Sequence, residues 1–346
     1  MCTALSYRQN GHYFGRTLDI ERSYGEEVVV LPRRKTESLK SGGTFTTRYA
    51  LIGMASLMGG RPMFYDAANE KGLVMAGLNF PGNMVLHPVE PGKDNIAPFE
   101  LFPWILGQAA DLQEARALLE RLNLVDLPLM EGVPGAELHY LISDRTGSLV
   151  VEPMAQGLKL YENPYDVMTN NPPFDYHLWN LRNYRHLSPE NQPNRFSAQY
   201  PLESYAMGMG AMGLPGDLSS ASRFVRAAFH LANSRCGETE EENVTQVFHI
   251  LDAVSMVRGC TLNDKGEEDV TSYTACINAE EGIYYYQTYE NRQITAIRMD
   301  QVDLDGSEIR HFPLRRRQEI RWENELPLRR KDSEGQLRTA VDPMVP

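Results

Sequence analysis

A series of short strand patterns fills the first eighty residues, and it constrains the fold more than any other feature of the chain. These apolar or alternating runs are separated by Gly, Asn, Pro or charged residues, which is typical of β-strands joined by turns. The runs are Thr3 to Tyr7, His12 to Gly15, Val28 to Leu31, Tyr49 to Ala55 and Leu73 to Leu78. We therefore expect the chain to open as a meander of sheet strands.

The rest of the chain mixes helical blocks with strand blocks. Apolar residues recur with helical spacing in Phe99 to Leu106 and Leu112 to Leu122, and Asp111 precedes the second run as an N-cap would. Further helices are expected near Tyr176 to Asn183, Ser220 to Asn233 and Glu241 to Val254, and further strands at Leu138 to Ser143, Leu149 to Glu152, Tyr273 to Asn278, Ile283 to Thr288 and Ile294 to Met299. Because regular β-α-β alternation is missing, two packed sheets flanked by helices are favoured over a doubly wound parallel sheet.

Length and composition allow one large domain. The 346 residues are 42% hydrophobic and 23% charged, close to the average for soluble globular proteins, so a folded core of enzyme size is possible. From about Asn324 onward the chain is charged, contains several prolines and loses apolar periodicity. We expect a single domain over residues 1–323 and a flexible tail over residues 324–346.

The net charge of −12 disfavours binding to nucleic acid or to an anionic membrane surface, so an anionic small substrate would need a local positive cluster. The N-terminus lacks a secretory signal pattern and no apolar run reaches membrane-spanning length, which predicts a cytoplasmic protein without membrane insertion. Four widely spaced cysteines, without any Cys-x-x-Cys pair, indicate reduced thiols rather than disulfides or structural zinc; they are Cys2, Cys236, Cys260 and Cys276.

Cys2 is the residue with the clearest chemical potential. Removal of Met1 would leave a thiol and a free α-amino group on one residue, so that nucleophile and base arrive together. A free α-amine has a pKa of about 7.7 to 8.0 and can accept a proton near neutral pH. Taken alone, Cys2 could equally be a small residue that merely follows the initiator methionine.

The segment Phe14 to Asp19 supplies the context for Cys2, because it places Arg16 and Asp19 within one short strand end. Arg16 could favour the thiolate, and Asp19 could orient the α-ammonium group. By spacing alone the two residues could also form an ordinary surface pair. Together with Cys2, however, Gly15-Arg16-x-x-Asp19 resembles the choloylglycine hydrolase family, which includes bile salt hydrolases and penicillin V acylases.

The resemblance extends over nearly the whole chain to about residue 312. The matching blocks, in family order, are Asn69-Glu70-Lys71-Gly72-Leu73, Ala76-Gly77-Leu78-Asn79-Phe80-Pro81, Thr169-Asn170-Asn171-Pro172, Gly213-Leu214-Pro215-Gly216-Asp217, Ser222-Arg223-Phe224 and Tyr284-Tyr285-Tyr286. The resemblance implies the α+β fold of N-terminal nucleophile hydrolases, a four-layer αββα sandwich in which the first strand delivers Cys2 to one end of the two sheets.

The resemblance also assigns roles to six residues. Cys2 matches the family nucleophile, and Arg16 and Asp19 match its N-terminal partners. Asn79 and Asn170 match the oxyanion-hole residues, and Arg223 matches a second cation near the sulfur. Two guanidinium groups would stabilise the thiolate, while the Asn170 side chain and the Asn79 backbone would hold the tetrahedral oxyanion. No metal or organic cofactor is implied.

The implied function is hydrolysis of glycine- or taurine-conjugated bile acids. Asn79 favours this activity, because members specialised for penicillin V tend to carry an aromatic residue there. The positions that line the family's sterol pocket fall on Leu18, Tyr24, Met58, Tyr65 and Val133. The alternatives are a penicillin V acylase or related N-acyl amidase, and a catalytically silent protein that only binds bile acids.

Other patterns receive plainer interpretations. The stretch Arg195 to Met212 resembles the family's projecting assembly loop, which implies a homotetramer. At its end, Gly208 to Gly213 fits a dinucleotide-binding pattern, but Pro215 and Gly216 follow where a helix should run, so a flexible loop is expected. The histidines, among them His139 and His177, show no metal-ligand spacing and are interpreted as structural.

Overall fold

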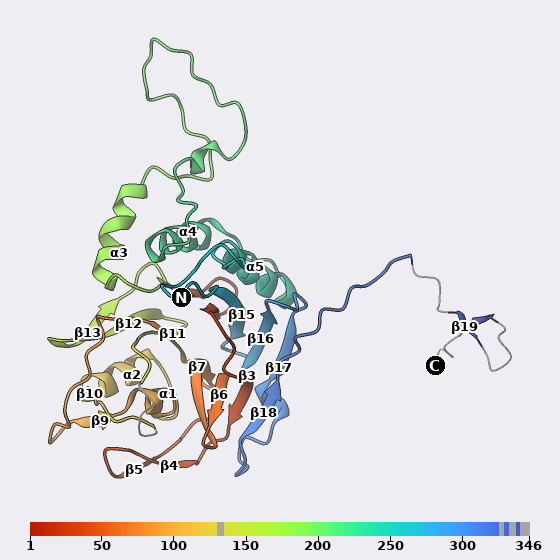
Figure 1. Cartoon of the computed structure of the whole chain (residues 1–346). Helices are drawn as coiled ribbons and strands as arrows, with labels where there is room; N and C mark the ends of the chain where they lie inside the picture. The colour runs from red at the N-terminus through yellow and green to blue at the C-terminus, as the bar shows by residue number, and fades with distance from the viewer. Residues whose placement is uncertain (130–134, 325–328, 332–336, 340–346) are drawn as a thin grey trace.

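The structure is a computed structural model, and it describes residues 1–129, 135–324, 329–331 and 337–339. Its centre consists of two antiparallel sheets that pack face to face, with helices on both outer faces (Figure 1). The predicted four-layer αββα sandwich is confirmed. Val133, one of the residues predicted to line a sterol pocket, lies outside the described residues.

One sheet has six strands and contains the start of the chain. Its strands, in spatial order, are β14 (Val167–Met168), β1 (Cys2–Tyr7), β2 (Tyr13–Ile20), β15 (Val270–Asn278), β16 (Ile283–Thr288) and β17 (Thr295–Arg298). All neighbours are antiparallel. Strand β15, from the last third of the chain, therefore pairs with β2, and β1 lies between β2 and the edge strand β14.

The other sheet has eight strands, all antiparallel to their neighbours. Its spatial order is β13 (Gly157–Glu162), β12 (Gly147–Met154), β11 (Leu138–Asp144), β8 (Val74–Asn79), β7 (Arg61–Asn69), β6 (Leu51–Met58), β3 (Glu26–Leu31) and β18 (Arg310–Pro313). Four short strands form two small ribbons beside it: β4 (Thr36–Ser38) with β5 (Thr44–Thr46), and β9 (Asp94–Ile96) with β10 (Leu122–Leu124). In the tail, β19 (Arg329–Lys331) pairs with β20 (Leu337–Thr339).

The helices cover the two outer faces. Helices α1 (Leu101–Leu106) and α2 (Leu112–Leu119) pack on the eight-stranded sheet, and α4 (Ser220–Asn233) and α5 (Glu240–Asp252) pack on the six-stranded sheet. Helix α3 (Phe174–Leu181) lies beside α4. At Gly15 a Cβ atom would lie 2.8 Å from side-chain carbons of α5, so glycine permits the close approach of α5 to β2.

Several element boundaries differ from the sequence-based expectations. The Asp111 side chain caps α2 by accepting a hydrogen bond from the Glu114 amide, as predicted, but the helix ends at Leu119 rather than Leu122. Leu122 instead begins β10, because its backbone pairs with β9. Strand β7 was not predicted, since Pro62 and Asp66 interrupt its apolar pattern. Among the described residues, no helix has the length and apolar character needed to cross a bilayer.

Candidate active site

Cys2 and Arg16 are brought together by the pairing of the first two strands. Cys2 pairs with Leu18, and Ala4 pairs with Arg16, so Cys2 and Arg16 project from the same face of the sheet. The Nη2 atom of Arg16 donates a hydrogen bond to Cys2 Sγ at 3.1 Å, and both side chains are almost completely buried. A guanidinium group next to a thiol favours the thiolate form, which is the nucleophilic form of cysteine.

Arg16 is held in place from the opposite sheet. Its Nη1 atom donates to the Tyr65 carbonyl at 2.7 Å and lies 3.6 Å from Asp66 Oδ2 on β7. The hydroxyls of Tyr273 and Tyr284 donate to the two carboxylate oxygens of Asp66, at 2.5 Å and 2.6 Å. Burial raises the pKa of Asp66, whereas Arg16 and the two hydroxyls oppose that shift.

Sequence reasoning did not identify the Asp66 cluster. Asp66 lies on the strand that was not predicted, and Tyr273 was named only as a strand boundary. Tyr284 entered only as part of a matching block. The one available signal was an isolated Asp between apolar residues, which is unusual inside a buried strand.

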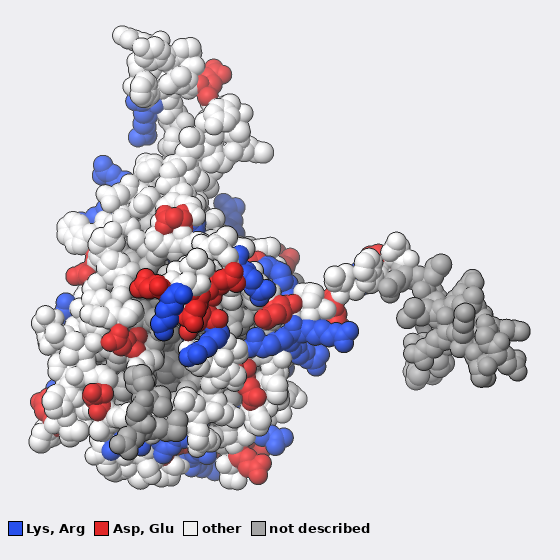
Figure 2. Space-filling model, viewed as in Figure 1, with Lys and Arg blue, Asp and Glu red and all other residues white. Residues whose placement is uncertain are grey.

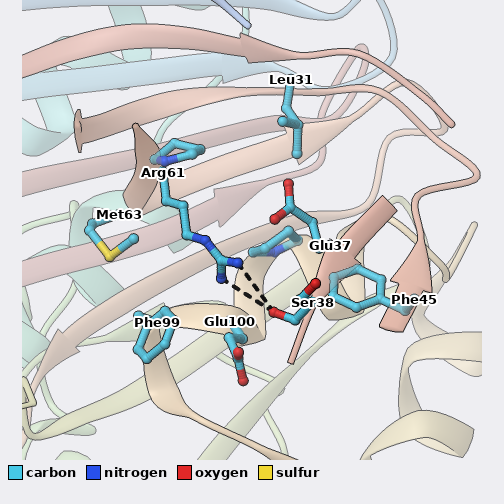
Figure 3. Close-up of a pocket in the computed structure, with 10 residues that line it drawn as sticks. Leu31, Glu37, Ser38, Phe45, Arg61, Met63, Phe99 and Glu100 are labelled. Atoms are coloured by element: carbon cyan, nitrogen blue, oxygen red, sulfur yellow. Dashed lines mark hydrogen bonds between the residues drawn. The ribbon is translucent and has the colours of Figure 1, made fainter. Parts of the chain in front are cut away.

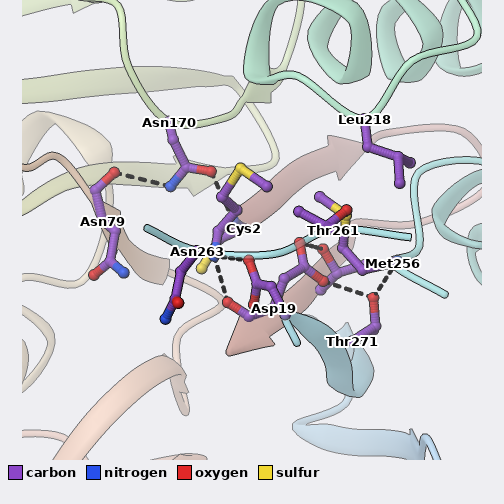
Figure 4. A network of polar contacts seen from close by, with 12 residues as sticks. Cys2, Asp19, Asn79, Asn170, Leu218, Met256, Thr261, Asn263 and Thr271 are labelled. Atoms are coloured by element: carbon purple, nitrogen blue, oxygen red, sulfur yellow. Dashed lines mark hydrogen bonds and ion pairs between the residues drawn. The ribbon is translucent and has the colours of Figure 1, made fainter. Parts of the chain in front are cut away.

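Asn170 connects Cys2 to β8. Its Oδ1 atom accepts hydrogen bonds from the Cys2 backbone nitrogen at 2.7 Å and from Arg223 Nη2 at 2.8 Å. Its Nδ2 atom donates to the Asn79 carbonyl at 2.8 Å (Figure 4). These contacts orient the side-chain amide so that one N–H group of Nδ2 points at the Asn79 carbonyl. The structure thus brings Asn79 and Asn170 together beside Cys2, as the sequence predicted.

Arg223 also lies beside Cys2, and its hydrogen bonds go to the backbone of Cys2 and to neighbouring side chains. It projects from α4 and donates to Thr3 Oγ1 at 2.7 Å and to the carbonyl oxygen of Cys2. Its contacts are therefore with the Cys2 backbone and with Asn170, while Arg16 contacts the sulfur. Burial lowers the pKa of Arg223, and Asp19 and Cys2 oppose that shift. Through these hydrogen bonds Arg223 holds the start of β1 and the side-chain amide of Asn170 in place.

Asp19 lies on β2 with its side chain on the face opposite to the Cys2 thiol, because it follows Leu18 by one residue. Its carboxylate accepts hydrogen bonds from Thr271 at 2.6 Å and Thr17 at 3.2 Å. Burial raises the pKa of Asp19, and the N-terminal ammonium opposes that shift. The Met1 ammonium forms its ion pair with Asp269, at 3.1 Å, a residue that sequence reasoning missed.

The predicted pocket-lining residues divide into two groups. Leu18 is the pairing partner of Cys2, and Tyr65 bonds Arg16 through its backbone oxygen and Ser56 through its hydroxyl. Tyr24 is 50% exposed beside Arg22, and Met58 is partly buried at the end of β6. The structure thus places Leu18 and Tyr65 next to the nucleophile and its cation.

Two cavities lie outside this cluster. Figure 3 shows a small one in which Arg61 donates to the Ser38 carbonyl at 3.3 Å, and no predicted site residue lines it. A larger cavity of about 310 Å³ lies at the end of α5, and Thr271 lines it. In the described part of the chain, no three His, Cys, Asp or Glu side chains are placed to hold a metal ion.

Comparison with known proteins assigns the chain to a family. The pattern of the linear amide C-N hydrolases, choloylglycine hydrolase family, matches residues 2–312. The chain belongs to the choloylglycine hydrolase family. The predicted resemblance is thereby confirmed, and so is the prediction of an amide-hydrolysing enzyme class.

Curated members of the choloylglycine hydrolase family match nearly the full chain. The bile salt hydrolase/transferase of Lactiplantibacillus plantarum is 45% identical over 316 residues, which cover 91% of this chain and 97% of that protein. The bile salt hydrolase/transferase of Clostridium perfringens is 39% identical over 317 residues, which cover 90% of this chain and 96% of that protein. Both relatives are named bile salt hydrolase/transferase.

Solved structures also match. A crystal structure of a variant of the conjugated bile acid hydrolase from Clostridium perfringens has a TM-score of 0.86 and 37% identity, covering 94% of this chain and 100% of that chain. The penicillin V acylase from Agrobacterium tumefaciens has a TM-score of 0.72 and 22% identity, covering 90% of each chain. At 22% identity, this match shows that the acylase and this chain have the same fold and nothing about a shared activity.

Proposed function

We propose that this member of the choloylglycine hydrolase family is a bile salt hydrolase, which cleaves the amide bond of glycine- or taurine-conjugated bile acids. The observation that carries the chemistry is the contact of Arg16 Nη2 with Cys2 Sγ at 3.1 Å, inside a buried site that also contains Asn170. The substrate class is supported by two relatives, at 45% and 39% identity, that are named bile salt hydrolase/transferase.

The proposed reaction begins with attack of the Cys2 thiolate on the amide carbonyl carbon. The carbonyl electron pair moves onto oxygen, and the oxyanion accepts hydrogen bonds from the Asn170 side chain and the Asn79 backbone amide. Asn170 Nδ2 uses one hydrogen on the Asn79 carbonyl, and its second hydrogen serves the oxyanion.

Proton transfer is assigned to the Cys2 nitrogen, which becomes a free α-amine once Met1 is removed. The amine accepts the thiol proton and passes it to the departing nitrogen of glycine or taurine. Departure of glycine or taurine leaves the bile acid attached to Cys2 as a thioester. Water then hydrolyses this thioester, which releases the free bile acid and restores the Cys2 thiol. Asn170 Oδ1 lies 2.7 Å from this nitrogen and keeps it beside the sulfur.

The apolar steroid is proposed to lie against Leu18, Tyr65, Met58, Tyr24 and Val133. Flat apolar ligands suit a lining of this kind, in which a few polar groups set orientation. Initial rates on glycocholate, taurocholate and penicillin V, measured side by side, test the substrate class. We expect both bile salts to be hydrolysed faster than penicillin V; a higher rate on penicillin V would reassign the enzyme as an acylase. Slow alkylation of Cys2 by a thiol reagent, together with no turnover of any of the three, would instead indicate a protein that only binds bile acids, because a silent site has no unusually reactive thiolate.

We also propose that the enzyme assembles as a homotetramer through the segment Arg195 to Met212. This segment projects from the body of the molecule in Figure 1, and most of its surface is uncharged in Figure 2. Phe196, Tyr205 and Met207 are 82%, 84% and 97% exposed, which is unusual for large apolar side chains unless a partner covers them. Light scattering should give the mass of four chains, and deletion of residues 195–207 should give a smaller species.

Two further proposals concern location and domain limits. A cytoplasmic location agrees with the four cysteines, all of which are free thiols, since oxidising compartments favour disulfides. A single catalytic domain is proposed for residues 1–323, with residues 324–346 as a flexible tail. Limited proteolysis should remove the tail and leave hydrolysis intact.

A further inference from the structure

The peptide bond that joins Thr169 to Asn170 is held at both ends by side chains from different layers. His139, on β11, lies with Nε2 2.7 Å from the Thr169 carbonyl oxygen. The hydroxyl of Ser220, at the start of α4, accepts a hydrogen bond from the backbone N–H of Asn170 at 2.9 Å. Because a carbonyl oxygen only accepts, Nε2 of His139 carries the hydrogen in this contact. The plane of this peptide is thus fixed from the eight-stranded sheet and from the helical layer.

The backbone carbonyl of Asn170 is also held by a buried histidine. His177, on α3, lies with Nε2 3.1 Å from the Asn170 carbonyl oxygen, and its ring stacks on Phe224 with 4.8 Å between centroids. Burial lowers the pKa of His177 to about 4, so the ring is neutral near pH 7 and has one N–H group. That group faces Asn170. Both carbonyls that flank the Asn170 α-carbon therefore accept a hydrogen bond from a buried histidine.

His139 also packs against the residue that follows Asn79. Its ring stacks on Phe80, which follows Asn79 directly, with 4.2 Å between centroids and an interplanar angle of 9°. Its Nδ1 atom lies 3.2 Å from Glu152 Oε1, and that oxygen accepts a hydrogen bond from the Phe174 amide at 2.9 Å. The His139 ring is consequently held by three neighbours and links the ends of β8 and β14.

We propose that His139 and His177 are positioning residues that fix the Asn170 side chain at the place where the oxyanion forms. This inference rests on the proposed amide hydrolysis and assigns two residues to the same site. Neither histidine forms a hydrogen bond with Cys2 or Arg16, so each is proposed to act through Asn170. Since an oxyanion donor works mainly on charge that develops in the transition state, a displaced Asn170 should lower kcat and leave KM nearly unchanged.

A matched pair of substitutions at His139 tests the proposal. His139→Gln places an amide nitrogen near the Nε2 position and can still donate to the Thr169 carbonyl. His139→Asn places its amide near the Nδ1 position, toward Glu152, and leaves that carbonyl without its donor. We expect His139→Gln to keep most of the parental kcat on glycocholate. His139→Asn should lower kcat by about 10²-fold, the typical effect of a misplacement of about 1 Å.

The same pair at His177 gives an independent measurement, because its Nε2 atom faces the Asn170 carbonyl. If His139→Asn fails to fold, the His177→Gln and His177→Asn pair decides the question. In every folded variant the rate of Cys2 alkylation by iodoacetamide at pH 7 should change far less than kcat, because the contact between Arg16 and the Cys2 sulfur is untouched. A merely structural role would lower the melting temperature of both members of a pair without separating their kcat values.

Equal kcat values for the Gln and Asn variants, or a change confined to KM, would overturn the proposal. The proposed function has a separate test on the parent enzyme, and it fails if glycocholate and taurocholate are not hydrolysed or if penicillin V is hydrolysed faster. In that case the variant pairs are compared on penicillin V or another amide that the parent does hydrolyse, and the same split in kcat decides the role of the histidines.

Discussion

Arg16 and Asp66 meet across the space between the two sheets, with Nη1 of Arg16 3.6 Å from Oδ2 of Asp66. Both side chains are completely or almost completely buried. Arg16 comes from β2 of the six-stranded sheet and Asp66 from β7 of the eight-stranded sheet. The cation that contacts the Cys2 sulfur is therefore compensated by a carboxylate from the opposite layer, and correct packing of both sheets is needed to build the nucleophile's surroundings.

Asp66→Asn should destabilise the protein more than removal of either tyrosine hydroxyl. Breaking a buried ion pair by neutralising one partner typically costs about 3 kcal/mol, because the remaining charge stays buried. Tyr284→Phe removes one hydrogen bond to Asp66 and should cost about 1 kcal/mol. Urea denaturation of the two variants and the parent provides the comparison. Equal losses in both variants would show that the Arg16 charge is compensated elsewhere.

Active enzyme should lack Met1. With Met1 present, the Cys2 nitrogen is an amide without a basic lone pair, and the Met1 ammonium is held by Asp269 at 3.1 Å, away from the sulfur. Intact-mass spectrometry of active enzyme should show a chain that begins at Cys2. Full activity in a preparation that retains Met1 would contradict the proposed proton transfer.

Asn170→Ala should lower kcat by about 10² to 10³-fold with little change in KM, because the lost side-chain donor acts on the developing oxyanion. Steady-state kinetics on glycocholate measure both constants. Asn79→Ala is the matched control, since the proposed role of Asn79 belongs to its backbone amide and its side chain is exposed. A rise in KM with kcat intact would reassign Asn170 to substrate binding.

Cys2→Ser should fold normally and lose nearly all hydrolysis. The substitution keeps the α-amine but replaces the thiol by a hydroxyl that stays protonated, so Arg16 has no thiolate to stabilise. Melting temperature and bile salt affinity should match those of the parent, because Leu18 and Tyr65 are unchanged. Near-parental hydrolysis by the variant would place the nucleophile at another residue.

The stability of the protein should fall as the pH drops from 7 to 5. Burial lowers the pKa of His12 to about 4, with a smaller contribution from Arg8, and burial likewise lowers the pKa of His177 to about 4. In the unfolded chain these histidines take up protons near pH 6.5. Their contribution to the free energy of unfolding is therefore fully present above that pH and is lost progressively toward pH 4.

Each of these two histidines should contribute a loss of about 2 kcal/mol between pH 7 and pH 5, because one pKa unit corresponds to about 1.4 kcal/mol. Denaturant unfolding at both values measures the loss. His12→Gln, which removes one titrating ring, should make the pH dependence shallower. An identical slope in the variant and the parent would exclude His12 as a source.

Much of the fold was predictable because its patterns are local. Strands β1, β3, β8 and β16 and helix α4 lie where their apolar spacing places them, and α4 begins and ends at the predicted residues. Strands β7 and β13 were missed, since Pro62 and Asp66 disturb one pattern and Gly157 and Lys159 weaken the other. Their positions depend on pairing with neighbouring strands rather than on their own sequence.

The sequence by itself identified Cys2, its neighbour Arg16 and the two asparagines as candidate site residues, because these residues lie in short motifs and Cys2 and Arg16 come from one local strand pair. Only the tertiary structure decided that Arg223 contacts the Cys2 backbone instead of the sulfur, and that Asp66, His139 and His177 support the site. The physical reason is separation along the chain. Each of these contacts joins residues from different layers or loops, and a side chain's partner across such a distance depends on how the layers pack.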